Sequence, residues 1–145
     1  MKHIFCKTMA VLALACAAGC DKTPANGGLD GFWQLVESGK GQPRPRKADR
    51  VFWAVQLDLV SVRSASELAP GTKEVLFRFR HGAGRLELTE GYAHYRDHDD
   101  RLEAPGEALG QAGVGTLPAV YRVHCLTDER MILVSADDSL VFRKY

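Results

Sequence analysis

The chain has 145 residues, which is enough for one domain with a sizeable core and too few for two. Its 19 basic and 18 acidic side chains nearly cancel, so the formal net charge is only +1. This balance disfavours a nucleic-acid-binding protein, because such proteins carry a pronounced basic excess.

The first 19 residues read as a secretory signal and not as part of the fold. Lys2 and Lys7 form a basic start, an apolar run follows over residues 8–15, and small residues precede Cys20. This order is typical of a cleaved signal peptide. The apolar run is far shorter than the roughly 20 residues that a membrane-spanning helix needs. We therefore expect residues 1–19 to be removed.

The residues around Cys20 form a lipobox, the cleavage site of the lipoprotein signal peptidase. Ala17, Ala18 and Gly19 precede the cysteine, with Ala17 where the consensus prefers leucine. Two alternatives stay open. Cys16 is a second candidate with a shorter apolar run before it, and ordinary cleavage would leave Cys20 as a simple thiol. We predict that Cys20 carries the lipid, so that the protein meets a membrane through its N-terminal anchor.

Cysteine usage agrees with this interpretation. Cys6 and Cys16 leave with the signal and Cys20 takes the lipid, so Cys125 is the one thiol of the mature domain. Period two places Cys125 on the same face as Tyr121 and Val123, and we expect it to be a buried small side chain. The domain therefore has no internal disulfide, although export would place it in a compartment that permits one. Its core alone must hold it together, which about 126 residues can do.

Residues 20–30 are polar and contain Pro24, Gly27 and Gly28, and we expect a flexible tether there. From residue 31 to residue 145, apolar and polar residues alternate with period two between turn residues, which predicts strands. The expected strands cover 32–36, 51–63, 75–80, 85–90, 92–95, 119–126, 131–135 and 140–144, with one helical turn at 107–111. Sequential hairpins without a long helix predict an all-β fold, a closed up-and-down antiparallel barrel of eight strands.

The two ends of this strand pattern resemble those of calycins, the lipocalins and fatty-acid-binding barrels. Gly31-Phe32-Trp33 matches the G-x-W motif of the first strand, and Arg143 lies in the last strand. The resemblance implies that Trp33 crosses the closed end of the barrel with Arg143 packed on its ring. Such a cation–π contact contributes about 0.5–2 kcal/mol.

A more specific likeness extends over nearly the whole mature chain. The lipobox, the segment G-F-W-Q-L at 31–35, the segment 47–54 and Phe77-Arg78-Phe79-Arg80 resemble small lipocalin-like lipoproteins of gut Bacteroidetes. Those proteins are largely without assigned function, so the resemblance implies fold and location and little chemistry.

Two polar segments could form sites. The first could bind a metal through His94, Asp97, His98, Asp99 and Asp100, with His81 nearby. A solvated acidic loop explains the same residues. We predict no metal site and no cofactor. The basic residues of the first long loop are Arg44, Arg46, Lys47 and Arg50. They could recognise phosphate or gate the barrel mouth, or they could form a solvated loop.

Inward-facing side chains could instead line an apolar cavity. The candidates are Trp53, Val55, Leu57, Phe77, Phe79, Tyr121 and Leu133. An eight-stranded barrel is wide enough either for packed side chains or for one small ligand. Motifs of hydrolases, metalloproteases and phosphate-binding enzymes are missing from the sequence, and we predict that the protein is not an enzyme.

The sequence thus predicts an envelope lipoprotein on a periplasm-facing leaflet. Asp21 after Cys20 retains lipoproteins in the inner membrane of enteric bacteria, a rule that leaves the choice between inner and outer membrane open elsewhere. Two functions compete. The leading one is binding of a small apolar or amphipathic ligand in the barrel mouth, and the other is a filled barrel that serves as an interaction module for an envelope protein partner. A cavity of several hundred Å³ would favour the first.

Overall fold

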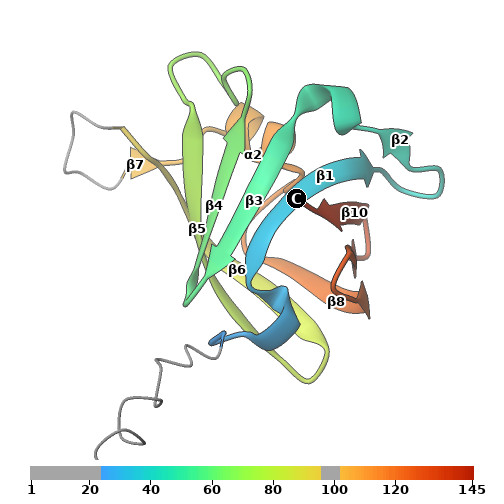
Figure 1. Ribbon diagram of the computed structural model, residues 1–145. Coiled ribbons are helices and arrows are strands. Elements are labelled where there is room, and N and C mark those ends of the chain that lie inside the picture. Colours follow the sequence, from blue (N-terminus) through green and yellow to red (C-terminus); the bar gives the residue numbers. More distant parts are fainter. Residues whose placement is uncertain (1–23, 96–101) are drawn as a thin grey trace, which may run out of the picture.

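Alternating residues between short turns fold here as an antiparallel meander (Figure 1). The computed structural model describes residues 24–95 and 102–145. Its strands are β1 (Gly31–Ser38), β2 (Arg44–Pro45), β3 (Val51–Gln56), β4 (Leu59–Ser64), β5 (Glu74–Gly82), β6 (Arg85–Ala93), β7 (Leu102–Glu103), β8 (Ala119–Leu126), β9 (Arg130–Val134) and β10 (Ser139–Lys144). β2 and β7 are two-residue additions at the margins of β1 and β6.

The remaining eight strands close into a barrel. Each pairs with the next along the chain, and β10 pairs with β1, where Trp33 lies opposite Lys144 and Leu35 opposite Phe142. Closure leaves the barrel itself without a free strand edge. The predicted all-β, eight-stranded up-and-down barrel is confirmed.

The expected long strand over 51–63 is wrong in one respect, since it is a hairpin of β3 and β4. Gln56 pairs directly with Leu59, so Leu57 and Asp58 form a two-residue turn. Leu57 has φ 55°, a left-handed conformation at a position where glycine is usual. Apolar residues at 55, 57 and 59 continue the alternation through this turn, so the sequence pattern predicts an unbroken strand.

Two other expectations fail at β-bulges. The predicted separate strand at 92–95 is the end of β6, which stays paired with β5 across a register shift at Arg78 and Phe79. A second shift between Val123 and Cys125 turns Cys125 to the outer face opposite Ile132, where it is partly exposed. One extra residue reverses the face of all that follow it.

The described residues also form three short helices, namely the 3-10 turns η2 (Gly27–Leu29) and η3 (Lys47–Asp49) and the helix α2 (Gly106–Ala112). α2 confirms the helical turn expected at 107–111. η2 corrects the boundary of the tether, because Leu29 is buried in the core. Residues 1–23, and with them the predicted signal and Cys20, lie outside the described residues. None of the described helices is long and apolar enough to span a membrane.

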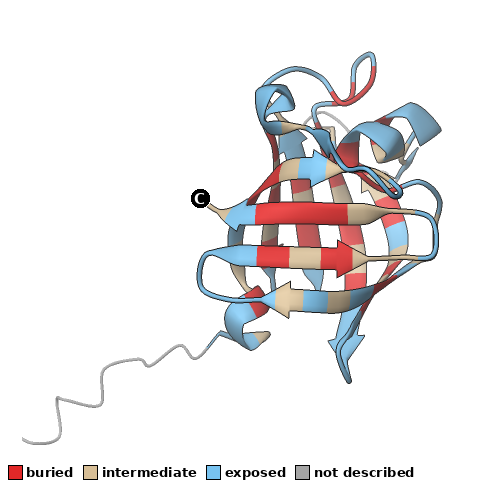
Figure 2. Cartoon of the chain, turned by 90° about the vertical axis from the view of Figure 1, so that its right-hand side faces the viewer, coloured by how far each residue is buried: buried red, intermediate tan, exposed pale blue. Residues whose placement is uncertain are grey.

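Burial follows the period-two pattern along the strands (Figure 2). In β3, for example, Val51, Trp53 and Val55 are buried while the residues between them are partly exposed. The buried set forms one core inside the barrel, and it includes residues of η2 and α2 at its two ends.

Candidate functional site

Six of the seven residues predicted to line a cavity point into the barrel. Trp53, Val55, Phe77, Phe79, Tyr121 and Leu133 are between 0% and 5% exposed. Burial, with a smaller contribution from Asp138, raises the pKa of the Tyr121 hydroxyl above its ordinary value, so the phenol stays protonated. Leu57 is the exception. It is 65% exposed at the tip of the β3–β4 hairpin, and its prediction as a cavity residue is wrong.

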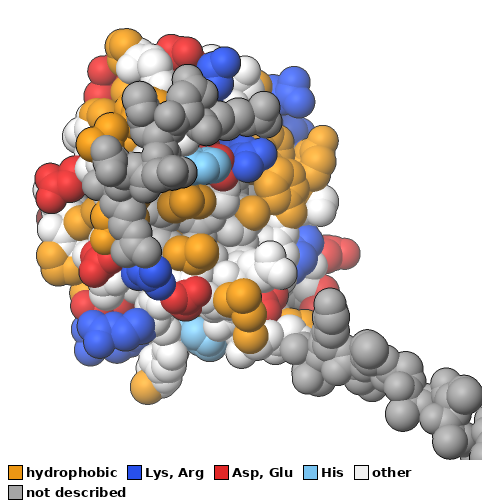
Figure 3. Space-filling view, turned by 90° about the vertical axis from the view of Figure 1, so that its left-hand side faces the viewer, with side chains coloured by type: hydrophobic (Ala, Val, Ile, Leu, Met, Phe, Trp, Pro, Cys, Tyr) orange, Lys and Arg blue, Asp and Glu red, His pale blue; other side chains and the backbone are white. Residues whose placement is uncertain are grey.

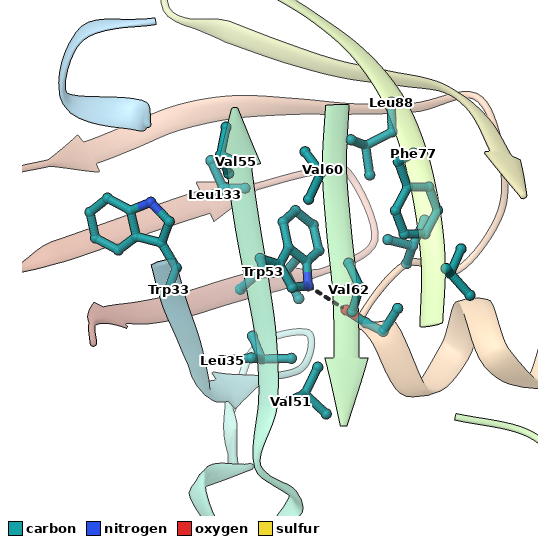
Figure 4. Close-up of a cluster of buried hydrophobic side chains, with 14 of the residues drawn as sticks. Trp33, Leu35, Val51, Trp53, Val55, Val60, Val62, Phe77, Leu88 and Leu133 are labelled. Carbon is teal, nitrogen blue, oxygen red and sulfur yellow. Dashed lines mark hydrogen bonds between the residues drawn. The ribbon is translucent and has the colours of Figure 1, made fainter. Parts of the chain in front are cut away.

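These inward side chains fill the barrel and leave no open cup among themselves. The indole of Trp53 occupies the centre, with its ring centroid 4.9 Å from that of Phe142 and 6.4 Å from that of Phe77 (Figure 4). Phe77, Leu88 and Leu133, on three different strands, are each 0% exposed. A side chain that lined a water-sized void would show exposed surface, so packing among these described residues approaches that of an ordinary protein interior.

The end of the barrel where β1 begins is closed by η2 and by Lys144. Trp33 Nε1 donates a hydrogen bond to the Leu29 carbonyl at 2.9 Å. The Lys144 ammonium lies 4.1 Å from the centroid of the Trp33 ring and donates to the Asp30 carbonyl at 2.7 Å. A Cβ on Gly31 would lie 2.4 Å from Lys144 Nζ, so the glycine of the G-x-W motif makes room for this cation.

Arg143 is therefore not the residue over Trp33, and that prediction is corrected. Successive strand residues alternate between faces, and Phe142 and Lys144 face inward. Arg143 faces outward, where its Nε donates to Gln34 Oε1 at 3.1 Å. The cation expected at the closed end is present, one residue further along the strand.

The opposite end is covered by α2. Ala108 and Ala112 of this helix are fully buried, and Trp53 Nε1 donates to the Ala112 carbonyl at 2.9 Å. Gly113 ends the helix with φ 89°, and a Cβ there would lie 3.1 Å from a methyl group of Leu35. Small residues thus let the helix sit directly on the core, at the end where an open barrel would admit a ligand.

A polar cluster lies on the outer face of β4, β5 and β6. Glu74, only 8% exposed, accepts hydrogen bonds from Ser61 and from Arg63 Nε at 2.9 Å, and its Oε2 lies 2.6 Å from His94 Nδ1. Burial raises the pKa of the Glu74 carboxyl, but the hydrogen bonds from Ser61, His94 and Arg63 outweigh it and the pKa lies below its ordinary value. An ionised carboxylate only accepts, so Nδ1 of His94 carries the proton.

A surface pocket of about 690 Å³ adjoins this cluster, lined by Arg63, Lys73, Glu74, His94 and Tyr95 among others. His94 was predicted with Asp97, His98, Asp99 and Asp100, and these four lie outside the described residues. Residues 24–95 and 102–145 contain no group of three side chains able to hold a metal. His81 lies on the β5–β6 hairpin, in a different pocket from His94.

The basic loop lies beside α2. Arg46 is tied down by Ser38, by Asp49 and by the Gln111 carbonyl of α2, to which its Nη2 donates at 2.9 Å. A pocket of about 660 Å³ is lined by residues 38–40 and 42–46, with Arg44 and Arg46 among them. The structure therefore brings Arg46 to the end of the barrel that α2 covers, while Lys47 lies in η3 and Arg50 directly precedes β3.

An outer aromatic cluster escaped the sequence analysis. Phe32 and Phe52 stack with ring centroids 5.1 Å apart, and Tyr145 packs edge-on against both at 5.7 and 5.0 Å. The signal was present: each Phe directly precedes an inward Trp, so period two places it on the outer face. On the face shown in Figure 3, hydrophobic side chains lie in several places between charged side chains.

Known proteins agree with this architecture. The family model described as a lipocalin-like domain matches residues 12–145. A lipocalin-like protein from Bacteroides uniformis has a TM-score of 0.58 at 17% identity, over 82% of this chain and 100% of that one. An uncharacterized protein from Bacteroides eggerthii has a TM-score of 0.53 at 20% identity, over 80% and 98%. No curated protein matches.

At these identities the two structures show the fold alone, whereas the family model spans nearly the whole chain. The chain belongs to the family of lipocalin-like domains.

Proposed function

We propose that the protein is an envelope lipoprotein, acylated at Cys20, whose barrel acts as an interaction module. Its outer surface, and not an internal cavity, would then carry the recognition. The observation behind this choice is the filled interior: inward side chains on β3, β5 and β9 are fully buried, and η2 and α2 cover the two ends. A carrier of an apolar ligand needs a cavity of several hundred Å³.

The outer face of β4, β5 and β6 supports the same proposal. Glu74 holds both Arg63 and His94 in fixed positions beside a surface pocket. Ordered polar groups reduce the conformational cost of binding, because their rotamers are already fixed. Neither the sequence motifs nor the contacts of Glu74 indicate a catalytic site, and we propose a non-enzymatic role.

The test of the binding mode is native mass spectrometry of the full chain, expressed in a bacterial host and extracted from its membranes in mild detergent. We expect the mass of the acylated protein without a further ligand, unchanged after incubation with palmitate or deoxycholate. Saturable uptake of either compound, with a change in the fluorescence of the buried Trp33 and Trp53, would reject the filled module in favour of a carrier.

The test of the anchor compares two cysteine variants. Cys20→Ala should abolish acylation, whereas the matched variant Cys16→Ala should still be cleaved before residue 20 and acylated there. Intact mass and labelling with radioactive palmitate report both properties. Loss of labelling in Cys16→Ala with retention in Cys20→Ala would move the anchor to Cys16.

A further inference from the structure

The exposed apolar side chains are concentrated near the end of the barrel where the tether enters. Leu57 and Tyr145 are 65% and 67% exposed, and Phe32 is 40% exposed. Asn26 Nδ2 donates to the Leu57 carbonyl at 2.8 Å, and the Tyr145 amide donates to the Phe32 carbonyl at 2.9 Å. These contacts place Leu57 beside Asn26, one of the first described residues of the chain, and Tyr145 beside the start of β1.

The same end carries basic side chains. Figure 1 shows η2, the β3–β4 turn and the β5–β6 hairpin at one end of the barrel and α2 at the other. Arg85 on this hairpin pairs in register with Arg122 on β8, and both are exposed. Of the carboxylates at this end, Asp58 pairs with Arg78 at 2.6 Å and Asp30 accepts a hydrogen bond from the backbone amide of Asn26 at 3.1 Å. Asp128 and Glu129 on the β8–β9 turn are exposed, and the Glu129 carbonyl accepts from the Lys144 amide.

The length of the tether limits how far this end can lie from the anchoring membrane. Five residues lie between Cys20 and Asn26, so six Cα–Cα steps separate the two. Fully extended, they reach about 20 Å. Side chains with an apolar body and a polar tip, such as tyrosine, favour the boundary between lipid and water, and basic residues favour anionic headgroups.

We infer that the tether-proximal surface formed by Phe32, Leu57 and Tyr145, with Arg85 and Arg122, rests on the bilayer that holds the acyl chain. The barrel then stands with α2 and the Glu74 pocket turned away from the membrane. This orientation accounts for a leucine at the hairpin tip, where solvent exposure alone would favour a polar turn residue. The inference rests on the proposed acylation of Cys20.

The experiment uses the acylated full chain in vesicles of phosphatidylethanolamine and phosphatidylglycerol. In a Cys125→Ser background, Leu57→Cys is labelled with an environment-sensitive fluorophore, and Gly110→Cys on α2 is the matched control. Gly110 is exposed, and a Cβ there would meet nothing within 4 Å. Brominated acyl chains should quench the label at position 57 about twofold or more and leave the label at position 110 unchanged.

A second variant tests whether the apolar side chains cause the orientation. With the label moved to Arg85→Cys, the double substitution Leu57→Asn and Tyr145→Ser should reduce quenching to the level seen at position 110. Asparagine tolerates the positive φ of residue 57, so the hairpin is expected to fold.

The outcomes separate the inference from the anchor on which it rests. Acylated protein that floats with the vesicles while both labels stay equally unquenched would overturn the inference and leave the anchor intact. Protein that neither floats nor carries the acyl mass would overturn both. Concentration-dependent shielding of position 57 without vesicles would assign this surface to a second copy of the chain, against the inference.

Discussion

We predict that the hydrogen bond between Trp53 and α2 stabilises the covered end of the barrel. Trp53→Phe keeps an aromatic ring at the centre of the core but leaves the Ala112 carbonyl, in a fully buried residue, without its donor. An unpaired buried acceptor costs about 1–3 kcal/mol. The lost ring atoms and the space they leave cost about 1 kcal/mol more. We expect a total loss of about 2–4 kcal/mol.

Trp33→Phe is the matched control, because Trp33 donates to the Leu29 carbonyl over the same 2.9 Å. Both variants should lower the free energy of unfolding in urea by similar amounts. Hydrogen exchange separates them: amides of α2 should exchange faster only in Trp53→Phe, and amides of η2 only in Trp33→Phe. A loss below about 1 kcal/mol in Trp53→Phe, with unchanged exchange in α2, would refute the view that this hydrogen bond fastens the helix.

Three further predictions concern the closed end, the helix terminus and acid. Lys144→Gln should lower the free energy of unfolding in urea by about 1–2 kcal/mol, because the cation over Trp33 is lost. Arg143→Gln should lower it by only about 0.3 kcal/mol. A larger loss in Arg143→Gln than in Lys144→Gln would show that Arg143 closes this end of the barrel. Gly113→Ala should lower the free energy of unfolding by about 1–2 kcal/mol, because φ is 89° and the new methyl group would meet Leu35. A Cβ on Gly115 would meet nothing within 4 Å, so the control variant Gly115→Ala should change the urea midpoint little. Glu74 has a lowered pKa in the fold, so its contribution is present above the ordinary value of 4.5 and is lost as pH falls through the folded value. Urea midpoints between pH 7 and pH 3 should therefore fall less steeply in Glu74→Gln, and equal slopes in the two proteins would contradict this role.

The architecture was predictable because the period-two pattern is strong and most turns carry glycine or aspartate. The failures have a common physical origin, since they are shifts of a single residue. At Leu57 the turn contains no glycine, so an outward leucine reads as an inward one. At the closed end, the resemblance placed a cation on residue 143, and the face that meets Trp33 belongs to residue 144. At Cys125 a bulge reversed the face.

The candidate site was less predictable than the fold. Nothing in the sequence links Glu74 of β5 to Ser61 of β4 or to His94, which directly follows β6, and the three meet only through strand register. The packing of α2 over the barrel end could not be predicted either. A seven-residue helix shows no amphipathic pattern long enough to indicate which surface it packs against.

The pairing of β1 with β10 has a consequence for the order in which the chain can fold. Gln34 and Arg143 meet across almost the whole length of the domain. Contacts so distant in sequence form slowly, because a long loop must close before they contribute any free energy. During synthesis, which starts at the N-terminus, the chain can form its hairpins one after another. The barrel cannot close until residue 144 has left the ribosome. Loss of the last few residues would therefore leave two open sheet edges, and with them a route to aggregation.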